Sequence, residues 1–197
     1  MHPAPLYRWD DRAAALAFVA EMSFAHVFAQ TPDGPRVAHV PVLVDGDALR
    51  FHLANTNGLT RFLDGAVALA SVAGPQAYVS PSWYARTDRV PTWAYVAIEC
   101  EGPVRRLAPG ELVDLLDVSA ATHEARVGRG WTRGKMPPGR FDAMCKAITG
   151  FELTVTALRT TRKLSQDSDA ADAAGVVAGL AAQGADAVAA LVAGTRA

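Results

Sequence analysis

Residues 37–53 read VAHVPVLVDGDALRFHL, and this stretch decides the class of fold. Apolar runs at 37–44 and 49–53 flank the tripeptide DGD at 45–47, which is typical of a β-hairpin turn. Strands joined by such a short turn pair in the antiparallel sense. The stretch therefore predicts two adjacent antiparallel strands.

The same apolar alternation recurs on both sides of this hairpin. It predicts further strands at 24–29, 67–72, 92–101 and 151–158. The strand at 67–72 is expected to end before Gly74-Pro75. Helices are expected from Asp10 or Asp11 to Met22, at 109–126 and 141–149, with one helical turn at 59–63. A mainly β fold with peripheral helices (α+β) follows. We expect a small closed or nearly closed antiparallel barrel, because closure removes exposed sheet edges.

The composition sets the domain organisation. The chain has 197 residues, 50% of them hydrophobic and 20% charged, which suits one globular domain and excludes a disordered protein. We assign residues 1–169 to a barrel domain with inserted helices at about 109–148, and residues 170–197 to an Ala-rich helical tail.

Several classes of protein are disfavoured by what the sequence lacks. Cys100 and Cys145 are too few for a disulfide framework or a zinc site, and no metal is expected. Motifs of nucleotide-binding loops, metalloproteases and serine hydrolases do not occur, so no catalytic residue is predicted. The N-terminus does not resemble a signal peptide and no apolar run predicts a membrane helix, so a cytoplasmic location is expected.

Aromatic residues gather between 74 and 95. This stretch holds five of the eight Trp and Tyr residues of the chain: Tyr78, Trp83, Tyr84, Trp93 and Tyr95. Such a cluster can form the walls around a flat ring-shaped ligand, or it can pack at the mouth of a barrel or in a dimer interface. In either case we expect the region to take part in a homodimer interface, because a large exposed aromatic patch is unfavourable in a monomer.

Motifs spread along the chain carry a family resemblance. They are AHVPVLVD (38–45), HLAN (52–55), FLDG (62–65), GPQAYVSPSWY (74–84), VPTWAY (90–95), HE (123–124), Trp131, GFEL (150–153), KLSQ (163–166) and GVVAGL (175–180). In this order they resemble the PaiB-type FMN-binding negative transcriptional regulators. The resemblance implies a six-stranded antiparallel split β-barrel, related to pyridoxamine-phosphate oxidases. It also implies a homodimer with FMN in a groove between the subunits, and a repressor function.

The resemblance also implies which residues contact the flavin. Two stretches should face the ring and the phosphate, and they comprise His39, Val40, Pro41, His52, Leu53, Ala54, Asn55 and Asn57. Further candidates are Arg61, Tyr78, Ser80, Trp83 and Lys163. For the two histidines, structural packing and a metal ligand are the alternatives to flavin contact, although no third metal ligand is evident.

Three positions depart from the family pattern. Asn55 replaces an arginine, Ala94 an asparagine and Glu99 a histidine. An arginine suits a phosphate dianion, and asparagine does not supply its charge. We therefore expect loose FMN binding and loss of the flavin on purification, unless Arg61 compensates.

Three functions are compatible with these observations. The first is a flavin-binding regulator, the second a flavin-dependent oxidoreductase acting on a small molecule, and the third a split barrel that has lost its flavin. Nineteen basic and twenty acidic residues give a net charge of −1, which does not favour direct DNA binding. The one basic cluster comprises Arg126, Arg129, Arg133, Lys135 and Arg140, which either contact phosphate or are simply solvated.

Overall fold

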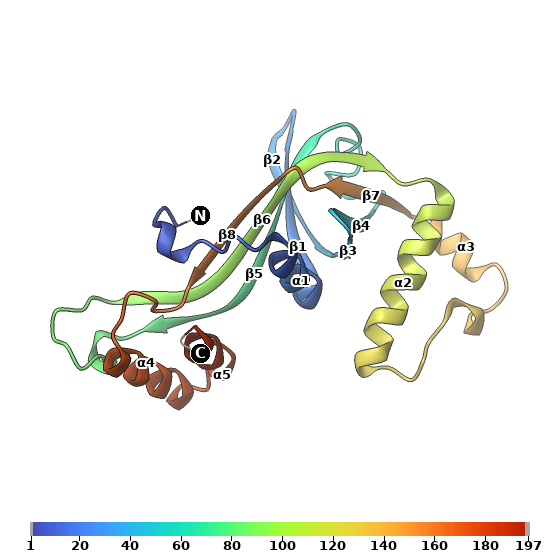
Figure 1. Ribbon diagram of the computed structural model, residues 1–197. Helices are drawn as coiled ribbons and strands as arrows, with labels where there is room; N and C mark the ends of the chain where they lie inside the picture. The colour runs from blue at the N-terminus through green and yellow to red at the C-terminus, as the bar shows by residue number, and fades with distance from the viewer. Residues whose placement is uncertain (1, 196–197) are drawn as a thin grey trace. The chain divides into compact units, whose positions relative to one another are not determined.

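The computed structural model describes residues 2–195 (Figure 1). The strands are β1 (Phe24–Thr31), β2 (Gly34–Pro41), β3 (Leu43–Asp45), β4 (Ala48–Ala54), β5 (Val67–Val79), β6 (Thr92–Arg106), β7 (Ile148–Thr154) and β8 (Ala157–Lys163). The α-helices are α1 (Arg12–Met22), α2 (Pro109–Val127), α3 (Arg140–Cys145), α4 (Ala170–Ala182) and α5 (Asp186–Gly194). Short 3-10 helices are η1 (Pro5–Tyr7), η2 (Pro81–Trp83) and η3 (Arg133–Lys135).

The strands form one mostly antiparallel sheet in the order β2-β1-β5-β6-β7-β4-β3, with β8 pairing to β6. The predicted class of fold, a mainly β protein with peripheral helices, is confirmed. Two details of the prediction were wrong. Eight strands are present in residues 2–195 rather than six, and the sheet is open rather than closed into a barrel.

The hairpin predicted from DGD is present, since Asp45 pairs with Ala48 between β3 and β4. The strand expected at 37–44, however, is divided into β2 and β3. The division falls at Val42, whose N–H donates to the carbonyl of Ser23 at 3.0 Å. The chain therefore changes its pairing partner there, which the apolar pattern alone does not reveal.

Two other strands differ from expectation at their ends. β5 continues through Gly74-Pro75 to Val79. A proline has no backbone N–H, so it interrupts a strand only where the neighbouring strand needs that donor for pairing. The single strand expected at 151–158 is split into β7 and β8. A Cβ at Gly102 would lie 1.7 Å from the carbonyl oxygen of Thr154, so the two segments cross in close contact where β7 ends.

The contacts divide the chain into two compact units. Unit A comprises residues 16–71 and 99–158, and unit B comprises the residues up to Ala15, Val72–Ile98 and the residues from Arg159 onward. The strands β5, β6 and β8 run through both units. This division rests on contacts between residues, whereas the boundary at residue 169 was predicted from composition. The boundary at residue 169 therefore stays a prediction.

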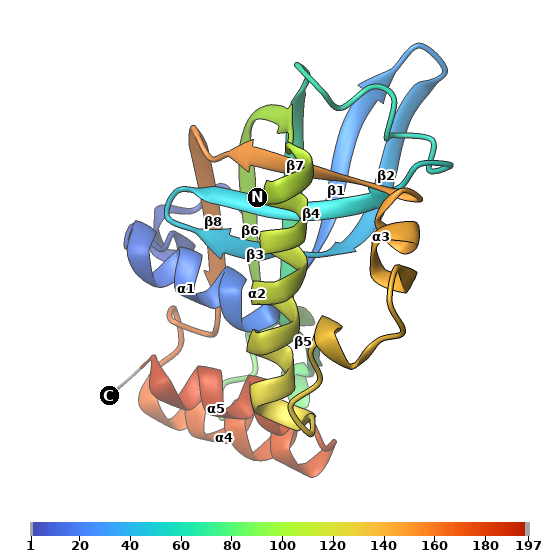
Figure 2. The same ribbon diagram turned by 90° about the vertical axis from the view of Figure 1, so that its right-hand side faces the viewer.

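The core of unit A lies between its strands. Phe51 of β4 pairs in register with Phe151 of β7, and their ring centroids are 5.8 Å apart. Both rings are fully buried, as are Leu49 and Leu153. Helix α2 packs against β4 and β7, and α3 packs against β7 (Figure 2).

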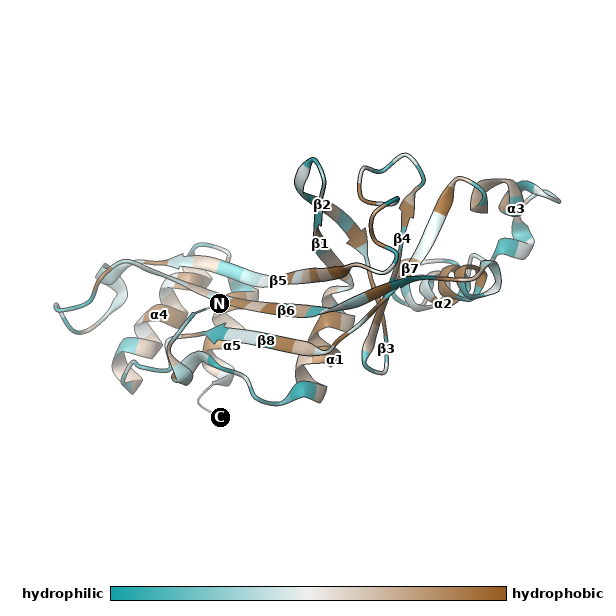
Figure 3. Ribbon diagram, turned by 90° about the horizontal axis from the view of Figure 1, so that it is seen from above, coloured by the Kyte–Doolittle hydropathy of each residue, from teal (hydrophilic) through white to brown (hydrophobic). Residues whose placement is uncertain are grey.

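The core of unit B includes α4 and α5, which pack against each other and consist mainly of apolar residues (Figure 3). Val176 and Leu180 of α4 and Val192 of α5 are fully buried. The glycines of α4 allow it to lie directly on η2, since a Cβ at Gly179 would be 2.2 Å from the indole of Trp83. The helix is therefore fitted to this one aromatic side chain.

Candidate functional site

The β1–β2 hairpin presents an exposed face of mixed apolar and imidazole character. Three cross-strand pairs lie on this face: Phe24 with Pro41, His26 with His39, and Phe28 with Val37. Phe24 is 47% exposed, and Phe28 and Val37 are each 41% exposed. The imidazoles of His26 and His39 meet edge to face, with centroids 4.8 Å apart. We call these six residues the hairpin face.

Of the predicted flavin contacts on β2 and β4, only some reach the surface. His39, Pro41 and Ala54 are exposed, and His52 is half-buried. Val40 and Leu53 point into the core, with 3% and 4% of their surface exposed. The side chains of Val40 and Leu53 therefore serve packing, and only their backbone can contact a ligand.

Asn55 follows β4 and bridges two neighbouring segments. Its amide nitrogen donates to the carbonyl of Lys146 at 2.8 Å, and its amide oxygen accepts from the hydroxyl of Thr149 at 2.8 Å. Asn55 therefore joins the end of β4 to the start of β7.

The turn after Asn55 is ordered by its own side chains. The Asn57 side-chain oxygen accepts from the N–H of Leu59 at 2.9 Å, and the Thr60 hydroxyl donates to the carbonyl of Ala54 at 2.7 Å. Arg61 extends from this turn with 73% of its side chain exposed, and its nearest acid is Asp33 at 3.8 Å. An anion near this turn would therefore find a cation that is weakly paired.

The remaining predicted contacts lie in unit B. Tyr78 and Trp93 make an edge-to-face contact with centroids 6.4 Å apart, and both are largely exposed. The Ser80 hydroxyl caps η2 by accepting from the N–H of Ser82 at 3.2 Å. Trp83 packs against α4, so its indole contributes to the fold of unit B.

Lys163 lines a small polar cavity of about 150 Å³ in unit B. Its ammonium donates to the hydroxyl of Thr92 and lies 5.9 Å from the ring centroid of Tyr7. The other lining residues are Tyr84, Arg89, Val90, Trp93, Ser165 and Asp167. Burial, together with the charge of Asp167, raises the pKa of Tyr7 and of Tyr84, so both phenols are protonated hydrogen-bond donors near neutral pH.

Asp172 of unit B was not among the predicted residues, and its only signal in the sequence is an acid within an Ala-rich helix. Its fully buried carboxylate accepts from the N–H groups of Ala85 and Arg86 at 2.9 and 3.2 Å. The guanidinium of Arg89 donates to it at 2.9 Å. Burial alone would raise the pKa of Asp172, but these donors outweigh it and the pKa is lowered. The ionised carboxylate thus holds the loop 85–89.

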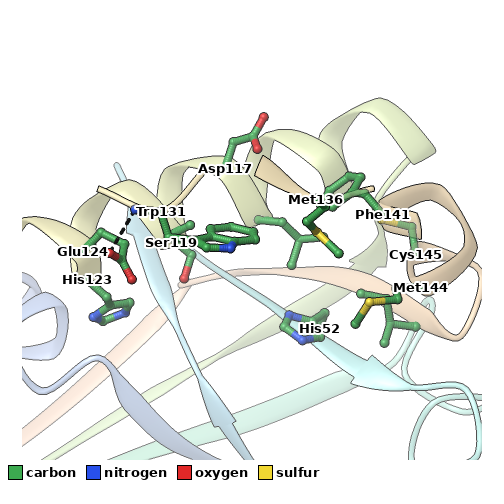
Figure 4. A pocket seen from close by; sticks show the side chains of 13 residues that line it. His52, Asp117, Ser119, His123, Glu124, Trp131, Met136, Phe141, Met144 and Cys145 are labelled. Atoms are coloured by element: carbon green, nitrogen blue, oxygen red, sulfur yellow. Dashed lines mark hydrogen bonds between the residues drawn. The ribbon is translucent and has the colours of Figure 1, made fainter. Parts of the chain in front are cut away.

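A larger cavity of about 460 Å³ lies in unit A, beneath α2 and the segment leading to β7 (Figure 4). We call it the α2–α3 pocket. It is lined by His52, Leu116, Asp117, Ser119, Ala120, His123, Glu124, Trp131, Met136, Phe141, Met144, Cys145 and Ile148. Apart from His52, none of these was predicted as a site residue. Burial lowers the pKa of His52, so its imidazole is neutral at pH 7.

The positions of the other family departures and of the basic cluster bear on binding. Ala94 is 2% exposed and faces the core, while Glu99 is half-buried.

The basic cluster is partly engaged in contacts of its own. Arg133 lies 3.3 Å from Asp117, and Arg126 and Lys135 donate to backbone carbonyls. Part of the cluster is therefore engaged within the chain.

Two further features, a metal site and a membrane-spanning helix, find no support among the residues that the structure describes. Between residues 2 and 195 no group of three or more His, Cys, Asp or Glu side chains is arranged to hold a metal ion. Over the same range, each helix is too short or too polar to span a lipid bilayer.

Comparison with known proteins decides the family. A family model described as "Putative FMN-binding domain" matches residues 1–157. The chain belongs to this FMN-binding domain family. Within the family, the Bacillus subtilis (strain 168) protein named protease synthase and sporulation protein PAI 2 is 30% identical over 165 residues, covering 81% of this chain and 79% of the relative. The resemblance seen in the sequence motifs is thereby confirmed.

Solved structures agree on the fold of this family member. The FAD and heme binding protein from Mycobacterium smegmatis is 19% identical, with a TM-score of 0.60 over 88% of this chain and 80% of that chain. The flavocytochrome Anf3 from Azotobacter vinelandii is 14% identical, with a TM-score of 0.67 over 88% of this chain and 78% of that chain. At these identities the likeness supports the split-barrel fold, and the family match supports a flavin cofactor.

Proposed function

We propose that this protein binds FMN as a homodimer, and that the flavin is held at the exposed edge of unit A. The observation that carries the proposal is the family match over residues 1–157, taken together with an exposed apolar face next to an available cation. FMN would supply reversible hydride or electron transfer when bound.

The residues of unit A fit such a cofactor. An isoalloxazine ring needs a flat apolar wall, and the hairpin face offers Phe24, Phe28 and Pro41 beside two imidazoles. The phosphate needs donors and positive charge, and Arg61 on the turn after β4 is largely exposed. His39 and Asn57 would lie toward the ring and the phosphate respectively, as the family motif implies. Lys163, Tyr78 and Ser80 of unit B would be the contribution of the second copy to the groove.

The homodimer is supported by the same surface. Three adjacent cross-strand pairs with apolar or imidazole side chains are exposed on one face, and an apolar face of this kind favours burial against a partner. A second copy would cover the hairpin face and enclose the ring.

Flavin retention is tested by the absorption spectrum of the purified protein and by FMN titration. Bands characteristic of oxidised flavin, or quenching of FMN fluorescence to saturation, are expected. Arg61→Ala should weaken binding by roughly tenfold, the loss of one charged contact to the phosphate. Arg36→Ala, which removes another exposed arginine of unit A, serves as the matched control. Unchanged FMN affinity in Arg61→Ala would remove Arg61 from the site.

For the biological role, we infer that the flavin-bound dimer acts in regulation, as the name of the B. subtilis relative suggests. Direct DNA binding has little support, because the net charge is −1 and several cations of the basic cluster are engaged within the chain. Salt-dependent retardation of duplex DNA by the FMN-loaded protein would establish direct binding.

A flavin-dependent oxidoreductase is the second candidate function. The observation that favours it is the α2–α3 pocket, which offers space for a small molecule beside His52. Oxidation of NAD(P)H by the flavin-loaded protein would distinguish this function from a regulatory one.

A further inference from the structure

The α2–α3 pocket has walls that suit a flat aromatic molecule. Trp131, Met136, Phe141 and Met144 line it from the segment between α2 and β7 (Figure 4). Trp131 is 41% exposed and Met144 is 52% exposed, so large apolar groups border an accessible cavity. Its volume of about 460 Å³ falls within the usual range of small-molecule sites, which is roughly 300–1,000 Å³.

The backbone at Trp131 is held in position at the pocket. The backbone N–H of Trp131 donates to the carboxylate of Glu124 at 3.0 Å, and the backbone N–H of Gly128 donates to the carbonyl of Glu124 at 2.9 Å. These two bonds fix the start of the loop against the end of α2. The aromatic wall is therefore tied to the helix that forms the opposite side of the pocket.

The charges around the pocket select against anions. Asp117 and Glu124 are among its lining residues, and none of the lining residues is a lysine or an arginine. The nearby guanidinium of Arg133 lies 3.3 Å from Asp117 and is partly neutralised by it. This guanidinium also lies over the ring of Phe141, 5.4 Å from its centroid. A phosphate or sulfonate would meet two carboxylates and one cation that is already paired with Asp117, which is unfavourable.

We propose that the α2–α3 pocket is a binding site, separate from the flavin site, for a flat aromatic molecule of two or three rings that is neutral or positively charged. Its rings would stack on Trp131 and Phe141 and contact the thioethers of Met136 and Met144. The imidazoles of His52 and His123 offer hydrogen bonds to a heteroatom of the ligand. Of the residues predicted to contact the flavin, His52 lines this pocket, but the aromatic and thioether walls do not depend on it, so the inference does not require that FMN binds.

Two fluorescent probes of the same ring system test the proposal on the full chain. N-phenylnaphthylamine is neutral, and anilinonaphthalene sulfonate carries one negative charge on the same rings. We expect the neutral probe to bind with a fluorescence increase and at least about tenfold more tightly than the sulfonate. Equal or tighter binding of the sulfonate would overturn the charge argument.

Two adjacent alanines of α2 provide matched variants. Ala120 lines the pocket and Ala121 is exposed beside it, so Ala120→Trp fills the cavity while Ala121→Trp does not. The first variant should lose at least about tenfold in affinity for the neutral probe, and the second should bind as the original protein does. Equal affinities in the two variants would locate the probe elsewhere and overturn the proposal.

Two further measurements keep the test decisive if Ala120→Trp does not fold. The double variant Asp117→Asn/Glu124→Gln should narrow the affinity gap between the probes, and an unchanged gap would contradict the proposal. Saturating FMN should leave binding of the neutral probe unchanged. Competition between the two would identify the pocket as the flavin site and overturn the inference of a separate one.

Discussion

The hydroxyl of Thr149 donates a hydrogen bond of 2.8 Å to the side-chain oxygen of Asn55. This bond joins the end of β4 to β7 at the position where the sequence resemblance implies an arginine. Asn55 thus has a structural task of its own in this chain.

The effect of a positive charge at position 55 on FMN affinity can be tested with two variants that both lose the hydrogen bond to Thr149. Asn55→Arg and Asn55→Ala remove the same amide, but only the first adds a guanidinium. We expect Asn55→Arg to bind FMN about tenfold more tightly than Asn55→Ala, because arginine pairs with phosphate. Titration with FMN, followed by flavin fluorescence, measures the difference. Equal dissociation constants would show that position 55 does not face the phosphate.

The hairpin face is expected to form the dimer interface. Phe28→Glu places a charge in the middle of this face and should shift the protein toward the monomer at micromolar concentration, since an unpaired charge is costly to bury. Sedimentation velocity reports the change. Val127→Glu, at a valine that is 88% exposed outside the face, should leave the dimer intact. A dimer that persists in Phe28→Glu would place the interface elsewhere.

Asp172 should be essential for the stability of unit B. Asp172→Asn removes the charge that the guanidinium of Arg89 and the N–H groups of the 85–89 loop require, and a fall in Tm of roughly 5 °C or more is expected. Asp186→Asn makes the same change at an exposed acid in the first turn of α5 and should have little effect. Because the pKa of Asp172 is lowered, its contribution is present above its unfolded pKa and is lost as the pH falls through the folded value.

Two helical glycines should respond to alanine with opposite signs. In Gly179→Ala the new methyl group would meet the indole of Trp83, so a loss of about 1–3 kcal/mol is expected. In Gly110→Ala of α2 nothing lies within 4 Å, and the variant should gain up to about 1 kcal/mol from helix propensity. Urea denaturation measures both. Trp83→Ala combined with Gly179→Ala should recover part of the loss, and full additivity of the two effects would argue against the contact.

Glu111 should make the stability of unit A depend on acid pH. Hydrogen bonds from Arg105, together with the N–H of Ala108, lower its pKa from 4.5 to about 2. Its contribution is therefore complete above pH 4.5 and is lost as the pH falls toward 2. The free energy of unfolding of Glu111→Gln should fall less than that of the original protein over this window. Glu21→Gln, at an exposed glutamate of α1, is the control, and parallel curves for all three proteins would contradict the assignment.

Local sequence patterns were sufficient for elements whose limits depend on nearby residues. The DGD turn lies where it was predicted, and α2 begins at Pro109 and ends at Val127, within one residue of expectation. The lengths of β5 and β6 could not be read from the sequence, because neighbouring strands rather than local alternation set how far they extend. The break between β7 and β8 depends on the crossing at Gly102, some fifty residues away in the chain.

The candidate sites were predictable only where a family motif supplied the residues. His39 and Asn57 were predicted from the family motifs and Arg61 from its position six residues after Asn55, and their contact with the flavin stays a prediction. The α2–α3 pocket was missed because its walls come from β4, α2 and the segment after it. Its sequence signals were His123-Glu124 and Trp131, which belong to the resemblance, and Met136 in a stretch otherwise rich in glycine and arginine.

The division of unit B among three separated stretches has a consequence for protein synthesis. Residues 72–98 are translated long before α4, which carries both the Asp172 carboxylate and the glycines that receive Trp83. Until the residues from Arg159 onward emerge, the 85–89 loop lacks its acceptor and Trp83 lacks the glycines of α4 against which it packs. We therefore expect unit B to fold only after the residues from Arg159 through α4 have been translated, with the 74–95 stretch open to chaperones in the interval.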